Sequence, residues 1–376
     1  MKTIATPDML PLESFITEYK DINMGNKYRP VAVGKYGIRT RESIYSKELA
    51  KDYSKNKLIY KNTLTVGMGS VQIDIGVLSD DVIYSVSPAY HTYKIKGINS
   101  LYLRYCLQCR NSDMFNRFAK RGSRQGKTID LKRWLKYEIP VYDIKTQEEI
   151  VCRLEKVLNL IELRKHQLQQ LDELVKSRFV EMFGDPTDIR LDRVPLAEYV
   201  ENTKYGTSQP PQFDENGCFK FIRATNIKNG HIIEKNMLFI SKAESEKISK
   251  CKLNSGELII VRSGANTGDT CIITDEYTGQ YAGYDIIVTL KTDKLNPVFL
   301  NELINIPQYM KKVVKPLTAR SAQPHLNTQQ VQGLPILVVD IDKQNEFANF
   351  VKQVDKSKFC VTNHLKKIQL IKGELL

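Results

Sequence analysis

Two segments of the chain place apolar residues at alternating spacings of four and three positions, the pattern of a helix that packs along a partner helix. Eight of ten spaced positions are apolar in the first segment, and seven of nine in the second. The apolar seam positions of the first segment are Ile150, Leu154, Val157, Ile161, Leu168, Leu171, Val175 and Met182. Those of the second are Phe347, Val351, Val354, Val361, Leu365, Ile368 and Leu375. Each segment predicts a long helix, and the common register predicts that the two helices pair.

The first predicted helix ends in the stretch LDELVKSRFVEMFGDP, Leu171 to Pro186. Gly184 can adopt the left-handed conformation that commonly follows a helix, and Pro186 prevents the helix from continuing. Arg164 and Arg178 interrupt the seam, either to select one register or partner face, or to extend their charged ends into solvent. The helix is therefore predicted to stop just before a second globular segment.

The sequence at the start of each predicted helix is also repeated. Ile139–Val157 and Leu334–Val354 both read as a short apolar strand containing a proline, a turn containing an aspartate, and a helix start. Each helix start carries Gln-x-Glu before an apolar residue, at Gln147 and at Gln344. The chain is therefore predicted to contain two copies of one unit.

The repeat is weaker further upstream. Lys35–Gly37 matches Lys204–Gly206 as Lys-Tyr-Gly, and Leu58–Ile59 is matched with Leu258–Ile259, each pair leading to a glycine-containing turn. Strand-like runs follow, VIYSVS and YDIIVTL, and then the helical patterns SLYLRYCLQC and PVFLNELIN. Each copy then has a basic segment. Both globular segments are therefore predicted to mix strands with helices.

The predicted fold follows from the order domain, helix, domain, helix. It is α+β, with two globular α/β-mixed domains in a tandem pseudo-two-fold repeat, separated by two long antiparallel coiled-coil helices. The predicted boundaries are residues 1–145, 146–184, 185–342 and 343–376. A helix over residues 146–183 would span about 55 Å, so antiparallel pairing would hold the domains apart, whereas parallel pairing would bring both to one end.

The charge of the chain is unevenly distributed. The net charge is +13, and residues 1–145 carry 25 Lys and Arg against 14 Asp and Glu. Residues 186–342 are balanced at 18 against 18, and residues 146–185 carry 6 against 8. A basic chain fits a polyanionic partner, most simply nucleic acid. The slightly acidic first helix fits a protein-binding face better than a nucleic-acid contact.

Catalytic, metal-binding and membrane signals are weak. The chain has no GxxxxGK[ST] phosphate loop, and its five histidines form no HxxxH pair. Cys106 and Cys109 form one CxxC on a helical pattern with no second pair nearby, which favours packing over zinc binding. We expect no metal and no disulfide. No segment approaches the ~20 apolar residues of a membrane helix, and the N-terminus does not resemble a signal peptide. We therefore expect a cytoplasmic protein without a membrane partner.

Three stretches carry a family resemblance. They are SRFVEMFGDP after the first long helix, RSGANTG within the second domain, and SAQPHLNTQQVQGLPILVVDIDKQNEF before the second helix. They resemble the specificity subunit of type I restriction–modification enzymes. The two-repeat layout extends this resemblance over essentially the whole chain. The first domain departs from it, because VGMGSVQIDIG stands in the place of RSGANTGDTCI.

The resemblance implies a non-catalytic subunit for DNA sequence specificity. Each globular domain would be a target recognition domain that reads one half of a bipartite, asymmetric site in double-stranded DNA. The helices would bind two methyltransferase (modification) subunits, through which restriction subunits would join. No cofactor is expected on this chain. S-adenosylmethionine is expected on the methyltransferase partner, and ATP and Mg on the restriction partner.

Candidate DNA-binding residues come from the loops and basic segments. Phosphate contacts are expected from Arg117, Lys120, Arg121, Arg124 and Lys127 in the first domain, and from Lys311, Lys312, Lys315, Arg320, Gln323 and His325 in the second. Base contacts are expected from Arg39, Arg41, Ser208, Gln209 and Gln212. Lys35, Tyr36, Lys204, Tyr205, Arg262 and Asn266 are further candidates. For RSGANTG a tight glycine turn is an equally good explanation, and core packing is an equal alternative for the two tyrosines.

Two other functions remain compatible with the sequence. One is a DNA-binding regulator that needs no enzyme partner, which tight sequence-specific binding by the chain alone would favour. The other is a nuclease with a cryptic active site, which cleavage by the purified chain would reveal.

Overall fold

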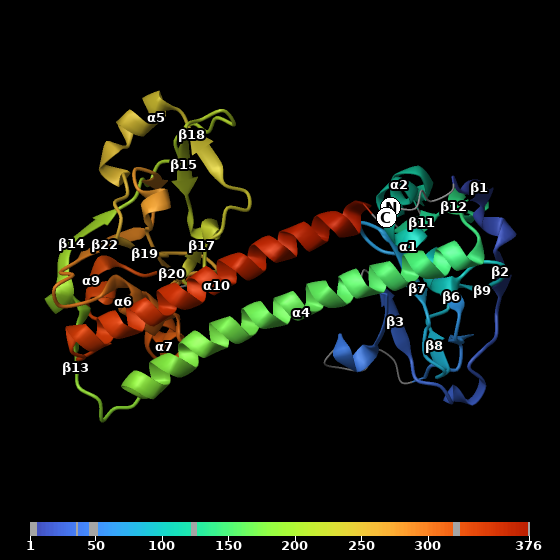
Figure 1. The fold of residues 1–376 in the computed structure, drawn as a ribbon, viewed down its shortest axis with the longest axis horizontal. Helices are drawn as coiled ribbons and strands as arrows, with labels where there is room; N and C mark the ends of the chain where they lie inside the picture. Colours follow the sequence, from blue (N-terminus) through green and yellow to red (C-terminus); the bar gives the residue numbers. More distant parts are fainter. Residues whose placement is uncertain (1–5, 35–36, 45–51, 122–125, 319–323, 375–376) are drawn as a thin grey trace. The chain divides into compact units, whose positions relative to one another are not determined.

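The computed structural model describes residues 6–34, 37–44, 52–121, 126–318 and 324–374 (Figure 1). The chain forms two compact units. The first comprises residues 1–163 and 365–376, and the second comprises residues 164–364. Each unit contains one mixed α/β domain and a part of each of two long helices, α4 (Ile144–Phe183) and α10 (Ile341–Glu374). The α+β fold predicted from the repeat is confirmed.

Both domains are built on a four-stranded antiparallel sheet with the same strand order. In the first domain the order is β2 (Ile16–Tyr19), β9 (His91–Ile95), β6 (Thr63–Met68) and β7 (Ile73–Val77). In the second it is β14 (Val200–Tyr205), β22 (Ile286–Leu290), β19 (Leu258–Ile260) and β20 (Thr270–Ile272). The central strands β6, β19 and β22 are apolar and largely buried on both faces, because helices and further strands cover the sheet. The fourth central strand, β9, is more polar and leaves Lys94 exposed.

The other strands form small sheets around each four-stranded one. The first domain adds β1 (Asp8–Pro11) with β12 (Glu138–Val141), β3 (Val31–Gly34) with β4 (Gly37–Thr40), β5 (Lys57–Ile59) with β8 (Tyr84–Val86), and β10 (Ala119–Arg121) with β11 (Lys127–Ile129). The second adds β13 (Arg193–Pro195) with β23 (Pro335–Leu337), β16 (Ile227–Lys228) with β17 (His231–Ile232), and β15 (Phe219–Ile222) between β18 (Leu238–Ile240) and β21 (Tyr281–Ala282).

The domain helices are short. The first domain contains α1 (Ser100–Cys109), α2 (Asn111–Phe118) and α3 (Leu131–Leu135). The second contains α5 (Lys242–Lys247), α6 (Pro297–Asn305), α7 (Pro307–Tyr309), α8 (Lys315–Thr318) and α9 (Thr328–Gln332). Asn99 caps α1 and Asn296 caps α6, each through a side-chain oxygen that accepts backbone N–H bonds. Cys106 and Cys109 lie on α1, as the helical pattern predicted.

The Gln-x-Glu signature marks the same buried hydrogen-bond clamp in both units. Gln147 accepts a bond from the Asn99 backbone N–H (2.8 Å) and donates one to the Tyr142 carbonyl (2.7 Å). Gln344 accepts from the Asn296 backbone N–H (2.9 Å) and donates to the Val339 carbonyl (2.8 Å). Both glutamines are 1% exposed. In each unit, the clamp therefore fixes the start of a long helix to the capped end of a domain helix.

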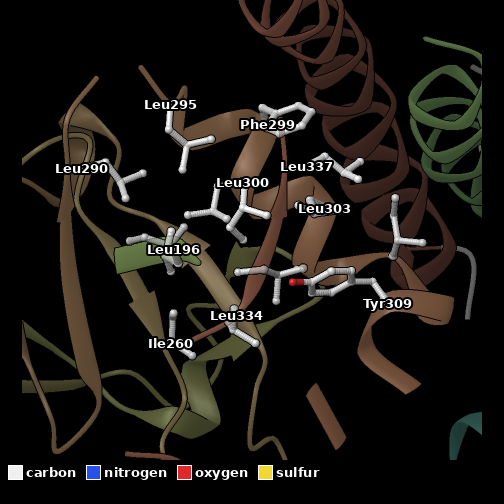
Figure 2. Close-up of a cluster of buried hydrophobic side chains, with 14 of the residues drawn as sticks. Leu196, Ile260, Leu290, Leu295, Phe299, Leu300, Leu303, Tyr309, Leu334 and Leu337 are labelled. Atoms are coloured by element: carbon white, nitrogen blue, oxygen red, sulfur yellow. The ribbon is translucent and has the colours of Figure 1, made fainter. Parts of the chain in front are cut away.

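The two long helices run antiparallel where they pack within the second unit. Phe179 of α4 contacts Phe347 of α10 with ring centroids 5.4 Å apart. Asp172, two turns earlier on α4, pairs with Lys358, three turns later on α10, at 2.7 Å. Val175 of α4 shares a core with the start of α10. That core continues into the domain, where Phe299, Leu303 and Tyr309 face Leu337 and Leu334 (Figure 2).

Every predicted seam residue that the structure describes is buried or half-buried, and Leu375 lies outside the described residues. The seam prediction was nevertheless incomplete. Phe179 is fully buried and Phe183 is 8% exposed, yet the spacing of four and three passed over both. Toward its end, α4 packs on the domain as well as on α10, so its buried stripe follows steps of four. At its start, Leu154 likewise joins the core of the first domain.

The weaker part of the repeat was matched wrongly. Leu58–Ile59 lies in β5, outside the four-stranded sheet, whereas Leu258–Ile259 lies in β19, whose counterpart is β6. The run VIYSVS contains β8, but the counterpart of β22 is β9. Gly37 begins the second strand of a hairpin, whereas Gly206 follows β14, the counterpart of β2. Short apolar or three-residue matches occur in any strand, so they do not identify equivalent strands.

Candidate nucleic-acid interface

A cluster around Arg262 forms at one edge of the second domain's sheet. Tyr205 ends β14, Tyr284 and Asp285 precede β22, and Arg262 follows β19. These three strands are neighbours, with Tyr205 opposite Ile286 and Ile260 opposite Ile286, so their ends meet. His325 joins the group through a bridge between its backbone and that of Ser263. Four segments distant in sequence therefore supply one site.

The Arg262 guanidinium is held by rings on several sides. It lies 4.1 Å from the ring centroid of Tyr284 and 5.0 Å from that of Tyr205. Its Nε and Nη2 atoms lie 3.2 and 3.0 Å from His325 Nε2. Because a guanidinium only donates, His325 Nε2 accepts, which assigns the ring proton to Nδ1. The Tyr205 hydroxyl in turn accepts bonds from Thr328 Oγ1 (2.5 Å) and Thr328 N–H (3.2 Å).

The positive charge of this cluster is not neutralised by an ion pair. Among the described residues, no carboxylate lies within ion-pairing distance of Arg262, and its Nη1 atom is buried without a hydrogen-bond partner. Asp285 accepts instead from the Arg262 backbone N–H (3.0 Å). Burial raises the pKa of Asp285 to about 6, although Arg262 acts in the opposite direction. The two tyrosines remain 38% and 44% exposed. Exposed rings around a held cation suit stacking on bases and attraction of phosphate.

The predicted contacts of the second domain divide into exposed and internally bonded side chains. Ser208, Gln209 and Gln212 are exposed on the loop that follows Tyr205, beside the cluster. Lys204 pairs with the buried Glu257 at 2.8 Å. The remaining internal bonds run from Asn266 Nδ2 to the Ala224 and Ile227 carbonyls, from Lys312 to Thr187, and from Lys315 to the Thr267 carbonyl. Lys311 is exposed, and Arg320 and Gln323 lie outside the described residues.

The RSGANTG segment forms a tight turn between β19 and β20. Gly264 and Gly268 adopt φ values of 95° and 94°, which favour glycine. Thr267 Oγ1 donates to the Gly264 carbonyl at 2.6 Å and closes the turn. The glycines therefore serve backbone geometry, while Arg262 at the start of the segment serves the cluster.

In the first domain, the predicted arginines lie at a hairpin. Arg39 is exposed on β4. The Arg41 guanidinium lies 5.1 Å from the ring centroid of Tyr53, and its Nε is buried without a hydrogen-bond partner. Lys35 and Tyr36 lie outside the described residues. This hairpin therefore presents one exposed and one ring-stacked arginine.

The basic segment of the first domain has acidic neighbours that the sequence reading did not pair with it. Arg117 bonds to Asp113 at 2.7 Å, one helical turn earlier in α2, and Lys120 lies 3.6 Å from Asp130. Lys127 donates to the Ser70 carbonyl at 3.0 Å. The structure describes the backbone of Arg121 in β10, and Arg124 lies outside the described residues. Exposed pairs are worth about 0–1 kcal/mol, so a phosphate can replace the carboxylate at little cost.

Tyr284, Asp285 and Thr328 are the cluster residues that sequence reasoning missed. A signal for two of them was present, because YDIIVTL places Tyr-Asp directly before a strand.

Of the residues that the structure describes, no group of three or more His, Cys, Asp or Glu side chains could hold a metal ion. Nor does any described helix have the length and apolar character needed to cross a bilayer.

Comparison with known proteins places both halves of the chain in one family. The family model described as the type I restriction modification DNA specificity domain matches residues 16–173 and again residues 196–372. These two matches coincide with the two structural repeats.

A protein of similar sequence is named as a specificity subunit. The type I restriction enzyme MjaVIII specificity subunit of Methanocaldococcus jannaschii is 22% identical over 283 residues. The match spans 70% of this chain and 65% of that protein, just under two thirds of the relative's length.

Solved structures share the fold along the whole chain. The S subunit of a type I restriction–modification system from M. genitalium matches with a TM-score of 0.57 and 15% identity, over 100% of this chain and 96% of that one. A chain from a structural study of complex assembly and conformational transition of the type I R-M system matches with a TM-score of 0.55 and 13% identity, over 100% and 97%. At these identities the matches support the fold alone.

Proposed function

Because the chain belongs to the family of type I restriction modification DNA specificity domains, and contains two copies of the domain, we propose that it is the DNA specificity subunit of a type I restriction–modification complex. In this role the chain selects the DNA sequence and performs no catalysis. Each domain reads one half of a bipartite, asymmetric site in double-stranded DNA. The two half-sites differ in sequence because the two domains carry different residues on their loops, although the strand order of their sheets is the same.

The duplicated architecture is the observation that carries this proposal. Each copy has the same sheet, and in each a buried glutamine fixes a long helix to the domain. Two recognition domains on a chain with paired helices imitate a two-fold dimer, which suits two half-sites separated by a spacer of fixed length. A helix of 40 residues such as α4 is about 60 Å long, or about 1.7 turns of B-DNA.

The long helices are the proposed docking sites for two methyltransferase subunits. Leu163 on α4 is 65% exposed, and Phe359 and Leu370 on α10 are 68% and 69% exposed. These exposed apolar side chains lie on helices that also carry a buried stripe, and we propose them as part of the surface that binds the methyltransferase. S-adenosylmethionine would be bound by the methyltransferase. Restriction subunits, with ATP and Mg, would join through it. We place the complex in the cytoplasm, where its DNA lies.

In the second domain, the Arg262 cluster is the proposed DNA contact. The rings of Tyr205 and Tyr284 fix the guanidinium before DNA arrives, so little side-chain entropy remains to be lost on binding. The exposed Ser208, Gln209 and Gln212 follow directly and can reach base edges.

Methylation mapping tests the proposal. The chain is combined with a type I methyltransferase subunit, and the methylated sites are sequenced for wild type, Tyr284→Ala and a matched control. The control is Glu246→Ala, which changes an exposed residue on α5. We expect a bipartite site, with recognition of one half weakened or relaxed in Tyr284→Ala only. A contiguous site, or methylation or cleavage by the chain alone, would overturn the proposal. Tight sequence-specific binding by a chain that recruits no methyltransferase would favour the regulator instead.

A further inference from the structure

The first domain contains a cleft of about 600 Å³ between the β3–β4 hairpin, strand β7 and helix α1. The hairpin packs closely on β7, since a Cβ atom at Gly76 would lie 2.5 Å from Ile38 Cγ1. Arg104, Tyr105 and Gln108 of α1 line one wall, and Leu158 of α4 contributes to the lining. Small-molecule sites typically occupy about 300–1,000 Å³, so the cleft can hold a nucleotide-sized group.

The equivalent junction of the second domain is closed. There the β16–β17 hairpin packs on β20, the counterpart of β7. Asn301 of α6 donates to the Gly230 carbonyl in the hairpin (3.3 Å) and accepts from Thr270 Oγ1 in β20 (2.8 Å). Asn305 also donates to Thr270 Oγ1, at 2.6 Å. Hairpin, strand and helix are thus joined by one buried polar network.

The repeat gives the residues that replace this network in the first domain. The offset of 197 residues that relates Gln147 to Gln344 also relates the helix caps Asn99 and Asn296. The same offset places Arg104 at the position of Asn301 and Gln108 at that of Asn305. In the first domain, Arg104 and Gln108 therefore line an open cleft. At the same positions in the second domain, two asparagines close the junction between hairpin and helix.

Arg104 has an uncompensated charge. Its guanidinium lies 4.6 Å from the Tyr105 ring centroid, and its Nε is buried with no hydrogen-bond partner. Within the described part of the chain, no carboxylate pairs with it. Arg39 also lines the cleft, as does one carboxylate, the exposed Asp80. The lining therefore carries two guanidinium groups against one carboxylate. Because buried donors in proteins are normally hydrogen-bonded, Arg104 Nε is expected to bond to an acceptor on a ligand.

We propose that this cleft is a phosphate-binding site, with Arg104 as its anchor and Arg39 and Gln108 as further donors. Arginine matches a phosphate with two parallel N–H bonds, and the neighbouring Tyr105 ring keeps the fork in place. The phosphate has two possible sources, a free nucleotide or the backbone of bound DNA. Only the DNA source rests on the proposed function, whereas the nucleotide source is independent of it.

Calorimetric titration with AMP, together with measurement of duplex-DNA affinity against salt concentration, tests the site. The variants are Arg104→Gln and the control Arg153→Gln, which removes an equal charge from an exposed α4 arginine paired with Glu149. If the source is a free nucleotide, AMP binds the wild-type chain and binds at least about tenfold more weakly to Arg104→Gln. If it is DNA, only Arg104→Gln lowers the slope of log K against log salt, by about 0.9.

The proposal is overturned if Arg104→Gln and Arg153→Gln behave alike in both titrations. Arg104→Lys retains the charge but loses the fork, so a phosphate site predicts binding between wild type and Arg104→Gln. Circular dichroism and melting curves establish that each variant is folded. A wild-type chain that binds AMP but no specific DNA would contradict the proposed function while supporting the cleft.

Discussion

The two domains are alike where they support the long helices and differ at the junction between hairpin and helix. Both have the same strand order and the same glutamine clamp. In the second domain, Asn301, Thr270 and Asn305 close the junction, whereas in the first Arg104 lines a cleft. The duplicated framework has therefore kept the interactions that fix the helices, while the surfaces available for recognition have diverged.

The largest expected effect is that of removing the Phe179 ring. This ring is fully buried and contacts Phe299 of α6 and Phe347 of α10 at 5.4 Å each. Phe179→Ala should lower the free energy of unfolding by about 3–5 kcal/mol, because it leaves a cavity where three elements meet. Hydrogen exchange with mass spectrometry should show the destabilisation in the second unit. Equal destabilisation of both units would contradict the division of the chain into two units.

The clamps provide a matched pair of substitutions. Gln147→Ala and Gln344→Ala each remove the partner of one backbone N–H and of one carbonyl, which costs about 1–3 kcal/mol per buried group before water can enter. Gln344→Ala also removes a longer bond, of 3.2 Å, to the Lys294 carbonyl. We expect similar decreases in unfolding free energy, on the order of 2–3 kcal/mol, each confined by hydrogen exchange to its own unit. Clearly unequal decreases would show that the two clamps are not equivalent.

The stability of the second domain is expected to depend on pH through Glu302. The first domain has Tyr105 at the equivalent position, by the offset of 197 residues. Burial raises the pKa of Glu302 to about 7; Asp355 and Asp172 act in the same direction, while Lys358 and Asn301 oppose it. Since its folded pKa is above the unfolded value of about 4.3, ionised Glu302 destabilises the fold. That cost is absent below about pH 4 and is complete above pH 7.

Glu302→Gln should therefore stabilise the second unit at pH 8 relative to wild type and change it least at pH 4. Chemical denaturation at the two pH values, followed by hydrogen exchange in each unit, measures the difference. A variant with the same gain at both pH values would show that packing, rather than ionisation, is responsible.

The smallest expected effect concerns DNA binding by the basic segment of the first domain, residues 117–127. Arg121→Ala with Arg124→Ala should weaken DNA binding to all sequences alike and flatten its salt dependence by about 0.9 for each phosphate that the variant no longer neutralises. Fluorescence anisotropy at several salt concentrations measures the slope. The matched control is Arg153→Ala with Lys156→Ala, which removes an equal charge from exposed positions of α4. An unchanged slope for the arginine pair would exclude Arg121 and Arg124 from phosphate binding.

The sequence was sufficient to predict the long helices and the start of each, because heptad spacing and the Gln-x-Glu signature are local patterns. It predicted α4 from residue 146 and α10 from residue 343, and the helices begin at Ile144 and Ile341. It missed Phe179 and Phe183 because a helix that packs on a domain core as well as on its partner helix has a different buried stripe.

The candidate site was only partly predictable. Arg262, Tyr205 and His325 were selected by residue type, but nothing local places them together. Their proximity depends on the order of β14, β22 and β19 in the sheet, which is a long-range property. The same order brings in Tyr284 and Asp285. In the first domain, Arg104 reads in the sequence as an ordinary polar residue of an amphipathic helix. It stands out as a candidate site residue only when its position is compared with that of Asn301, which closes the junction in the second domain.

Matched heptad insertion is the most direct test of the account. Seven residues are added to α4 and seven to α10 at facing positions, and methylated sites are mapped for the reconstituted complex. Each insertion lengthens its helix by about 10.5 Å, or about 3 base pairs of B-DNA. Insertion into α4 alone is the control and should impair function, because it unbalances the pair. We predict that the matched insertion leaves both half-sites unchanged and lengthens the spacer by about 3 base pairs. An active complex with an unaltered spacer would contradict two recognition domains held apart by paired helices.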